Sequence, residues 1–111
     1  MSARIASGAL VNALVRRASV EGGVVTVLAK GDPTAGAILI VAQERGEHPR
    51  LLERGIGPDG RVALISTGPS GELQEVTDYW IRRRRSDPDL WVVEVDVAAA
   101  ERFVAETILT D

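Results

Sequence analysis

Continuous runs of apolar residues alternate along the chain with short polar and glycine-rich segments. Residues 24–30 and 37–43 are β-branched and almost wholly apolar, which predicts two strands. Because neither run alternates with polar residues, both are expected to be central strands, covered on two faces or on one face and by a partner. Residues 50–56 predict a weaker third strand near an edge, and residues 61–66 predict a fourth.

The segment before the first strand has the periodicity of a helix. Five apolar residues fall on one broad helical face: Leu10, Val11, Leu14, Val15 and Ala18. The glycines at 22–23 are expected to end this helix. Arginines without any acidic residue before Glu21 also fit an amphipathic targeting or membrane-surface segment, although a structural helix is the preferred interpretation.

Apolar spacing returns to that of a helix after the fourth strand. Three apolar residues recur at intervals of three and four: Leu73, Val76 and Trp80. They predict a second helix over residues 72–85. A fifth strand is expected over residues 90–97, where apolar and acidic residues alternate, and a last helix over residues 98–109. Asp96 is a plausible N-cap for that helix.

These elements predict one α+β domain over residues 1–111, in the order α-β-β-β-β-α-β-α. Short connections favour a two-layer fold, in which a mainly antiparallel sheet of about five strands packs with three helices. The second helix is expected to return the fifth strand to a place beside the first, which gives the spatial order 5-1-2-3-4. Trp80, Trp91 and Phe103 are expected to form the bulk of one core.

Composition narrows the classes of function. The chain is 45% hydrophobic and 26% charged, so it can bury a core, and no apolar stretch is long enough to span a membrane. The absence of cysteine excludes disulfides and thiolate metal sites and fits a reducing compartment. A net charge of −3 makes nucleic acid an unlikely partner.

The segment between the first two strands has the glycine spacing of a phosphate-binding loop. Four residues separate Gly31 from Gly36, but no lysine follows and a strand comes next, so nucleotide binding is not expected. The simpler interpretation is a hairpin loop whose glycines adopt unusual φ angles. Lys30 and Asp32 are candidates for ligand contact at the rim of this loop.

Four consecutive arginines end the predicted second helix: Arg82, Arg83, Arg84 and Arg85. Helical neighbours point about 100° apart, so the four do not form one basic stripe. They lie where cations stabilise the last helical turn, and Asp87 and Asp89 can neutralise part of their charge. A structural helix end is the preferred interpretation, and an anion, nucleic-acid or protein contact through these residues is the alternative.

The sequence contains no convincing catalytic group. Asp89, Glu94 and Asp96 resemble in outline the acidic residues of a metal-dependent hydrolase, because carboxylates bind Mg²⁺. The lysine usual after the second acid is missing, however, since Asp96 occupies its place. His48 is the only histidine, and it precedes a proline in a charged turn. We therefore predict no catalytic residue, metal site or cofactor.

Two stretches of the sequence are similar to those of a known bacterial family. The first stretch is Lys30-Gly31-Asp32-Pro33 with Ala35-Gly36-Ala37-Ile38-Leu39, and the second is Arg82 to Arg85 followed by Asp87-Pro88-Asp89-Leu90-Trp91-Val92-Val93-Glu94. With them the chain resembles the family called domain of unknown function 1491, found mainly in alphaproteobacteria. The resemblance implies a bacterial, cytoplasmic protein and assigns no catalytic residue.

The expected function is a non-enzymatic module that binds a protein partner or associates with itself as a homo-oligomer. This expectation rests on the absence of a catalytic constellation. Two alternatives stay open. One is an anion- or nucleic-acid-binding protein that uses Lys30 and the arginines at 82–85, and the other is a metal-dependent hydrolase that uses the acids near the fifth strand.

Overall fold

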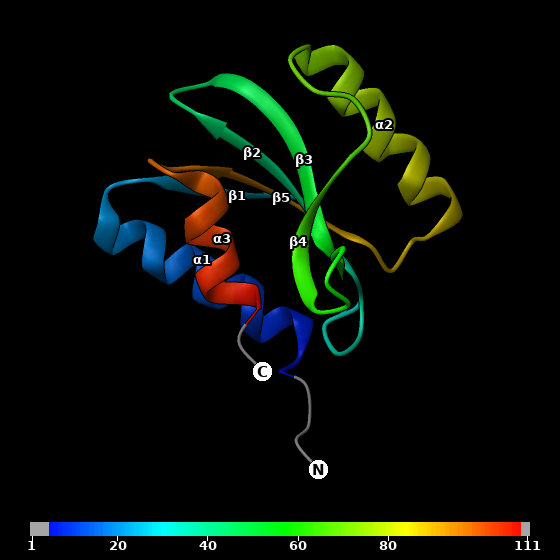
Figure 1. Ribbon diagram of the computed structural model, residues 1–111, viewed down its shortest axis with the longest axis horizontal. Helices are drawn as coiled ribbons and strands as arrows, with labels where there is room; N and C mark the ends of the chain where they lie inside the picture. Colours follow the sequence, from blue (N-terminus) through cyan, green and yellow to red (C-terminus); the bar gives the residue numbers. More distant parts are fainter. Residues whose placement is uncertain (1–4, 110–111) are drawn as a thin grey trace.

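A five-stranded sheet with helices on both faces makes up the computed structural model of the protein, which describes residues 5–109 (Figure 1). In chain order the elements are α1 (Ser7–Glu21), β1 (Val24–Ala29), β2 (Ile38–Glu44), β3 (Glu47–Ile56), β4 (Val62–Thr67), α2 (Leu73–Ser86), β5 (Trp91–Asp96) and α3 (Ala100–Ile108). The predicted α+β class and the predicted element order are confirmed. The ends of the predicted domain, at residues 1–4 and 110–111, lie outside the described residues.

The strands lie in the order β1-β5-β2-β3-β4. β5 is antiparallel to β1 and parallel to β2, and the remaining pairs are antiparallel. The predicted order 5-1-2-3-4 is therefore wrong, because β5 inserts between the first two strands instead of pairing outside them. The connection at residues 30–37 is long enough to pass the inserted strand, so β1 and β2 do not form a hairpin.

The insertion of β5 also moves β1 to the edge of the sheet, which corrects its prediction as a central strand. β2 and β5 are the strands covered on both faces, and six residues of β2 in succession are buried. Successive side chains of a strand point to opposite faces, so a strand buried on both faces carries no polar alternation. The prediction of a central strand is thus confirmed for residues 37–43 only.

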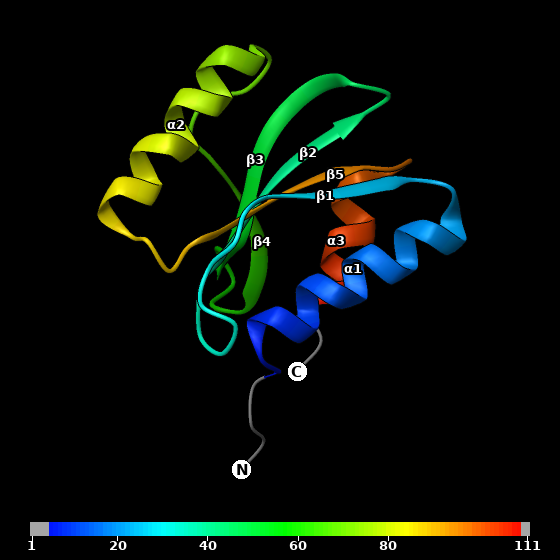
Figure 2. The same cartoon turned by 180° about the vertical axis from the view of Figure 1, so that it is seen from behind.

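Helices cover both faces of the sheet, so the fold has three layers where two were predicted. α1 and α3 lie on one face, as Figure 2 shows, and α2 lies over the other. The larger core cluster, on the face of α1 and α3, includes Leu14, Ile40, Val93 and Phe103. The smaller cluster, under α2, contains Leu39, Val41, Leu51, Val76, Leu90 and Val92.

The predicted single aromatic core does not form. Trp91 and Phe103 belong to the larger cluster, but Trp80 is only partly buried, against the smaller cluster. The sheet separates these residues because α2 packs on the face opposite α3. Val76 is the buried residue of α2, and Leu73 on the same predicted stripe is exposed.

Of the two predicted helix caps, the one that ends α1 is confirmed and the one that begins α3 is wrong. Gly22 ends α1 in the left-handed conformation, with φ of 82°, as the sequence predicted. Asp96 does not cap α3, which contradicts its predicted role. Its carboxylate accepts hydrogen bonds from the backbone N–H groups of Arg45 and Gly46 at 2.7 and 2.8 Å, and so closes the turn between β2 and β3.

No helix among residues 5–109 has the length and apolar composition needed to cross a membrane.

Candidate functional site

The two stretches that suggested a family meet in space. The loop at residues 30–37 packs against residues 87–91, and we call these two segments together the loop junction. The N–H of Asp32 donates to the carbonyl of Asp89 at 3.0 Å, and indole Nε1 of Trp91 donates to the carbonyl of Asp32 at 2.7 Å. The junction therefore fixes the path of the chain between β1 and β2 against the start of β5.

Gly31 and Gly36 are required by close packing in this junction. A Cβ atom at either position would lie 2.2 Å from the carbonyl oxygen of Asp89. Neither glycine has a positive φ, so the expectation of unusual backbone angles here is wrong. Both glycines pack against the same carbonyl group, and no side chain larger than a hydrogen atom fits at either position.

Arg84 ties the end of α2 to both segments of the junction. Its Nη1 donates to the carbonyls of Lys30 at 3.3 Å and Leu90 at 3.0 Å, and also to the carbonyl of Pro88. Nη1 carries two N–H groups, so the three carbonyl oxygens share its donors. Arg84 is thus engaged within the fold.

The other arginines of the run have separate surroundings. Nη1 of Arg83 lies 3.0 Å from both carboxylate oxygens of Glu53 on β3. Partial burial acts to lower the pKa of Arg83, but hydrogen bonds with Glu53 and Tyr79 raise it overall. Arg82 and Arg85 are exposed and contact no charged group within residues 5–109. The structure therefore does not gather the four arginines into one site.

The predicted acidic residues are also dispersed. Oδ2 of Asp32 accepts the N–H groups of Thr34 and Ala35, and Oδ1 of Asp87 accepts the N–H of Asp89. These contacts are typical of carboxylates that stabilise turns. In the part of the chain that the structure describes, no three histidine or acidic side chains come together as a possible metal site.

The outer edge of β1 is a feature that sequence reasoning missed. β1 pairs only with β5 among the described strands, so the backbone groups on its other side have no strand partner. Val24, Val27 and Leu28 are 61%, 41% and 37% exposed. One register shift interrupts the ladder with β5, between Val27 and Ala29. The signal was present in the sequence as an apolar run, but it was assigned to the sheet interior.

Lys30 is the predicted site residue nearest to this edge. It follows β1 directly and is exposed, whereas its carbonyl belongs to the loop junction. Glu21 lies at the opposite end of the strand, at the end of α1. An uncharged edge strand is therefore flanked by one acidic and one basic residue.

Three solved structures resemble this fold. A crystal structure of a DUF1491 family protein from Caulobacter crescentus is 33% identical, with a TM-score of 0.76, and the match covers 90% of this chain and 94% of that one. An NMR structure of a DUF1491 family protein from the same organism is 32% identical, with a TM-score of 0.74 and coverage of 92% and 94%. The solution structure of protein Atu0922 from A. tumefaciens is 29% identical, with a TM-score of 0.69 and coverage of 86% and 87%.

The family comparison agrees with these structures. No curated protein matches the chain. The family model described as protein of unknown function, DUF1491, matches residues 5–105 and spans both segments of the loop junction. The chain therefore belongs to the bacterial DUF1491 family, as its two characteristic stretches indicated.

Proposed function

We propose that the protein is a self-associating module, in which two copies pair through the outer edge of β1. The observation that carries this proposal is an exposed, apolar edge strand that contains no charged residue and no proline. Natural edge strands usually carry such residues because unpaired backbone groups beside apolar side chains promote pairing with another strand. Addition of a strand would cover both the backbone groups and the valines.

A second copy of the chain fits this edge better than an unrelated strand. Antiparallel pairing centred on Thr26 would place that residue opposite itself and Val25 opposite Val27 of the second copy. Val25 and Val27 pair with Val95 and Val93 of β5, so both lie on the face that α1 covers, and the register keeps like faces together. The pairing would satisfy a two-fold axis, the commonest symmetry of soluble dimers.

The charged residues at the two ends of the strand do not oppose this arrangement. The paired strands run in opposite directions, so the two Lys30 side chains would lie at opposite ends of the interface and would not repel each other. Glu21, at the end of α1, is bound within its own copy by Arg17, whose Nη2 lies 2.8 Å from the Glu21 carboxylate. The pairing therefore depends on backbone groups and apolar side chains, and Lys30 lies at its margin.

The orientation of α1 directs Arg17 away from the proposed interface. Arg17 points toward α3, where its Nη1 donates to Oγ1 of Thr107 at 2.7 Å and its guanidinium lies 4.5 Å from the ring centre of Phe103. Leu14 is buried against the sheet. The side of α1 next to the free edge of β1 is therefore the side opposite Arg17.

Uncharged residues occupy that side of α1. At about 100° per residue, Val15 falls roughly opposite Arg17, and Asn12 and Ser19 lie near it. Val15 is exposed despite its apolar side chain. When the sheets join edge to edge, the two α1 helices come together on the same face, with these uncharged residues on their facing sides.

The decisive experiment is sedimentation of the wild-type protein and of Thr26→Lys over a range of concentrations. The substitution places two lysines opposite each other at the proposed axis, so we expect dimer dissociation to shift by at least about tenfold. Thr26 is exposed, and the melting temperature of the monomer should hardly change. Ser66→Lys is the matched control, because Ser66 is exposed on β4, the strand at the other edge.

Two outcomes would contradict the proposal. One is a wild-type protein that stays monomeric at about 1 mM, because a dimer with a weaker dissociation constant would not be a specific assembly. The other is a dimer that Thr26→Lys and Ser66→Lys affect equally, which would place the interface elsewhere.

A further inference from the structure

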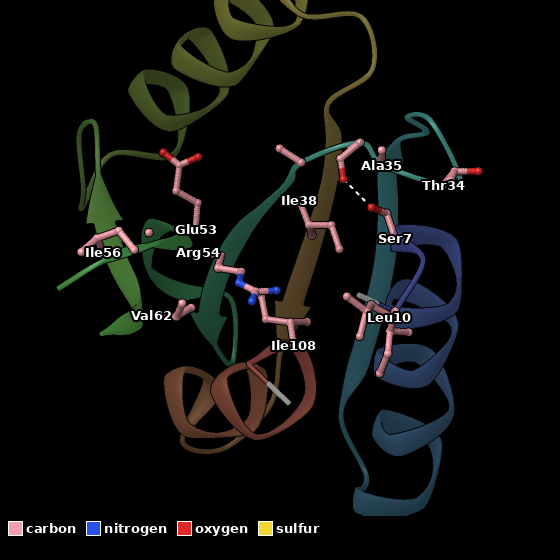
Figure 3. A pocket seen from close by; sticks show the side chains of 14 residues that line it. Ser7, Leu10, Thr34, Ala35, Ile38, Glu53, Arg54, Ile56, Val62 and Ile108 are labelled. Atoms are coloured by element: carbon pink, nitrogen blue, oxygen red, sulfur yellow. Dashed lines mark hydrogen bonds between the residues drawn. The ribbon is translucent and has the colours of Figure 1, made fainter. Parts of the chain in front are cut away.

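A second surface with exposed apolar residues surrounds a cavity of about 470 Å³. The cavity lies between the start of α1, the loop at residues 34–38, and the hairpin of β3 and β4 (Figure 3). Leu10, Ile38 and Ile108 line its inner part, and Ile56 and Val62 line its outer part. Its volume falls within the range of small-molecule sites, which is about 300–1,000 Å³.

The loop wall of this cavity is held from both sides. Oγ of Ser7 donates to the carbonyl of Gly36, and the N–H of Gly8 donates to the carbonyl of Pro33 at 2.8 Å. On its other side the same loop makes the contacts of the loop junction with Asp89 and Trp91. A wall fixed in this way is preformed for a ligand and does not have to be ordered on binding.

Charge in the cavity is supplied by Arg54. Neighbouring residues of a strand point to opposite faces, and Figure 3 shows the Arg54 side chain directed toward Ile108 while Glu53 points away. The carboxylate of Glu53 is bound by Arg83 on the face of α2. Arg54 is thus the one cation among the described residues that line the cavity.

We infer that this cavity binds a small amphipathic anion, in which an apolar chain ends in a carboxylate. Apolar side chains on the inner and outer walls would contact the chain of the ligand, and the guanidinium of Arg54 would bind the carboxylate. A guanidinium has five donors, so Arg54 can bind a carboxylate alongside the contacts that it makes within the protein. Planar carboxylates match the fork geometry of arginine, which favours this head group over an uncharged one.

The test is a titration followed by backbone amide NMR, with octanoate as the probe. We expect saturable shifts at the residues that line the cavity, weaker binding of 1-octanol, which lacks the charge, and no saturable binding of acetate, which lacks the chain. Arg54→Gln should weaken octanoate binding roughly tenfold to a hundredfold, as loss of a hydrogen bond to a charged group does. Arg61→Gln is the matched control, because Arg61 is a neighbouring cation that does not line the cavity.

A second variant keeps the inference testable if Arg54→Gln fails to fold. Ala35 is exposed on the loop wall, and Ala35→Trp should block the cavity and abolish the octanoate shifts without disturbing the core. Thr26→Lys should bind octanoate like the wild type, so this inference and the proposed dimer can fail separately. Equal binding of octanol and octanoate, equal binding by the Arg54 and Arg61 variants, or no saturable shift would overturn the inference.

Discussion

β1 and β2 are similar apolar strands with opposite surroundings. β2 pairs with β3 and β5, its faces lie against helices on both sides, and its first six residues are buried. Among the described strands β1 pairs with β5 alone, and four of its six residues are exposed. An apolar run therefore shows how much a strand is able to bury, and its neighbours decide how much it does bury. The apolar surface that β1 leaves uncovered is what a second copy would cover.

The comparison predicts its largest difference for truncation of one side chain in each strand. Ile40 in β2 is fully buried in the larger core cluster, so Ile40→Ala should cost about 3–4 kcal/mol of unfolding free energy. Leu28 in β1 is partly exposed, and Leu28→Ala should cost less than about 1 kcal/mol in the monomer. Urea denaturation of the two variants at low protein concentration measures both. Equal losses would show that the two strands are equally buried in solution.

Substitution in the connection between the two strands should lower stability almost as much as truncation of Ile40. Gly36→Ala places a Cβ atom 2.2 Å from the carbonyl of Asp89, and we expect the loop junction to shift at a cost of about 2–3 kcal/mol. Gly57→Ala is the control, because the nearest atom there is the flexible carboxylate of Asp59 at 3.3 Å. Thermal melts should separate the two variants clearly. A Gly36→Ala protein as stable as Gly57→Ala would mean that the junction yields easily.

Substitutions in α2, the helix that covers one face of β2, should lower the stability of the protein by a smaller amount. Trp80 is partly buried against the cluster that contains Leu39 and Val41, so Trp80→Ala should cost about 1–2 kcal/mol, less than the loss of a fully buried tryptophan. Tyr79→Phe, in the same helix, removes a hydrogen bond to Thr67 and should lower the free energy of unfolding by about 0.5–1 kcal/mol. Denaturant melts of the two variants measure both losses. If Trp80→Ala lowered the free energy of unfolding by more than about 3 kcal/mol, Trp80 would be a core residue, as the sequence predicted.

Several features of the candidate sites could be foreseen, and others could not. The two stretches at residues 30–39 and 82–94 were found from the sequence, and their meeting in the loop junction explains them as packing. The separate contacts of Arg83 with Glu53 and of Arg84 with backbone carbonyls were not foreseen, because both join residues of different elements. The cavity beside Arg54 was missed for the same reason, since its walls come from four separate parts of the chain.

Local patterns of apolar and polar residues were sufficient to predict the eight elements of residues 5–109, their order and the α+β class, because the periods of helices and strands depend on neighbouring residues. The place of β5 between β1 and β2, and the packing of α2 opposite α1 and α3, follow from contacts between distant parts of the chain and could not be predicted from these patterns. No local period records which edge a returning strand will pair with, since that choice depends on the burial available across the whole sheet. The insertion of β5 made β2 an interior strand and left β1, of nearly the same composition, at an open edge.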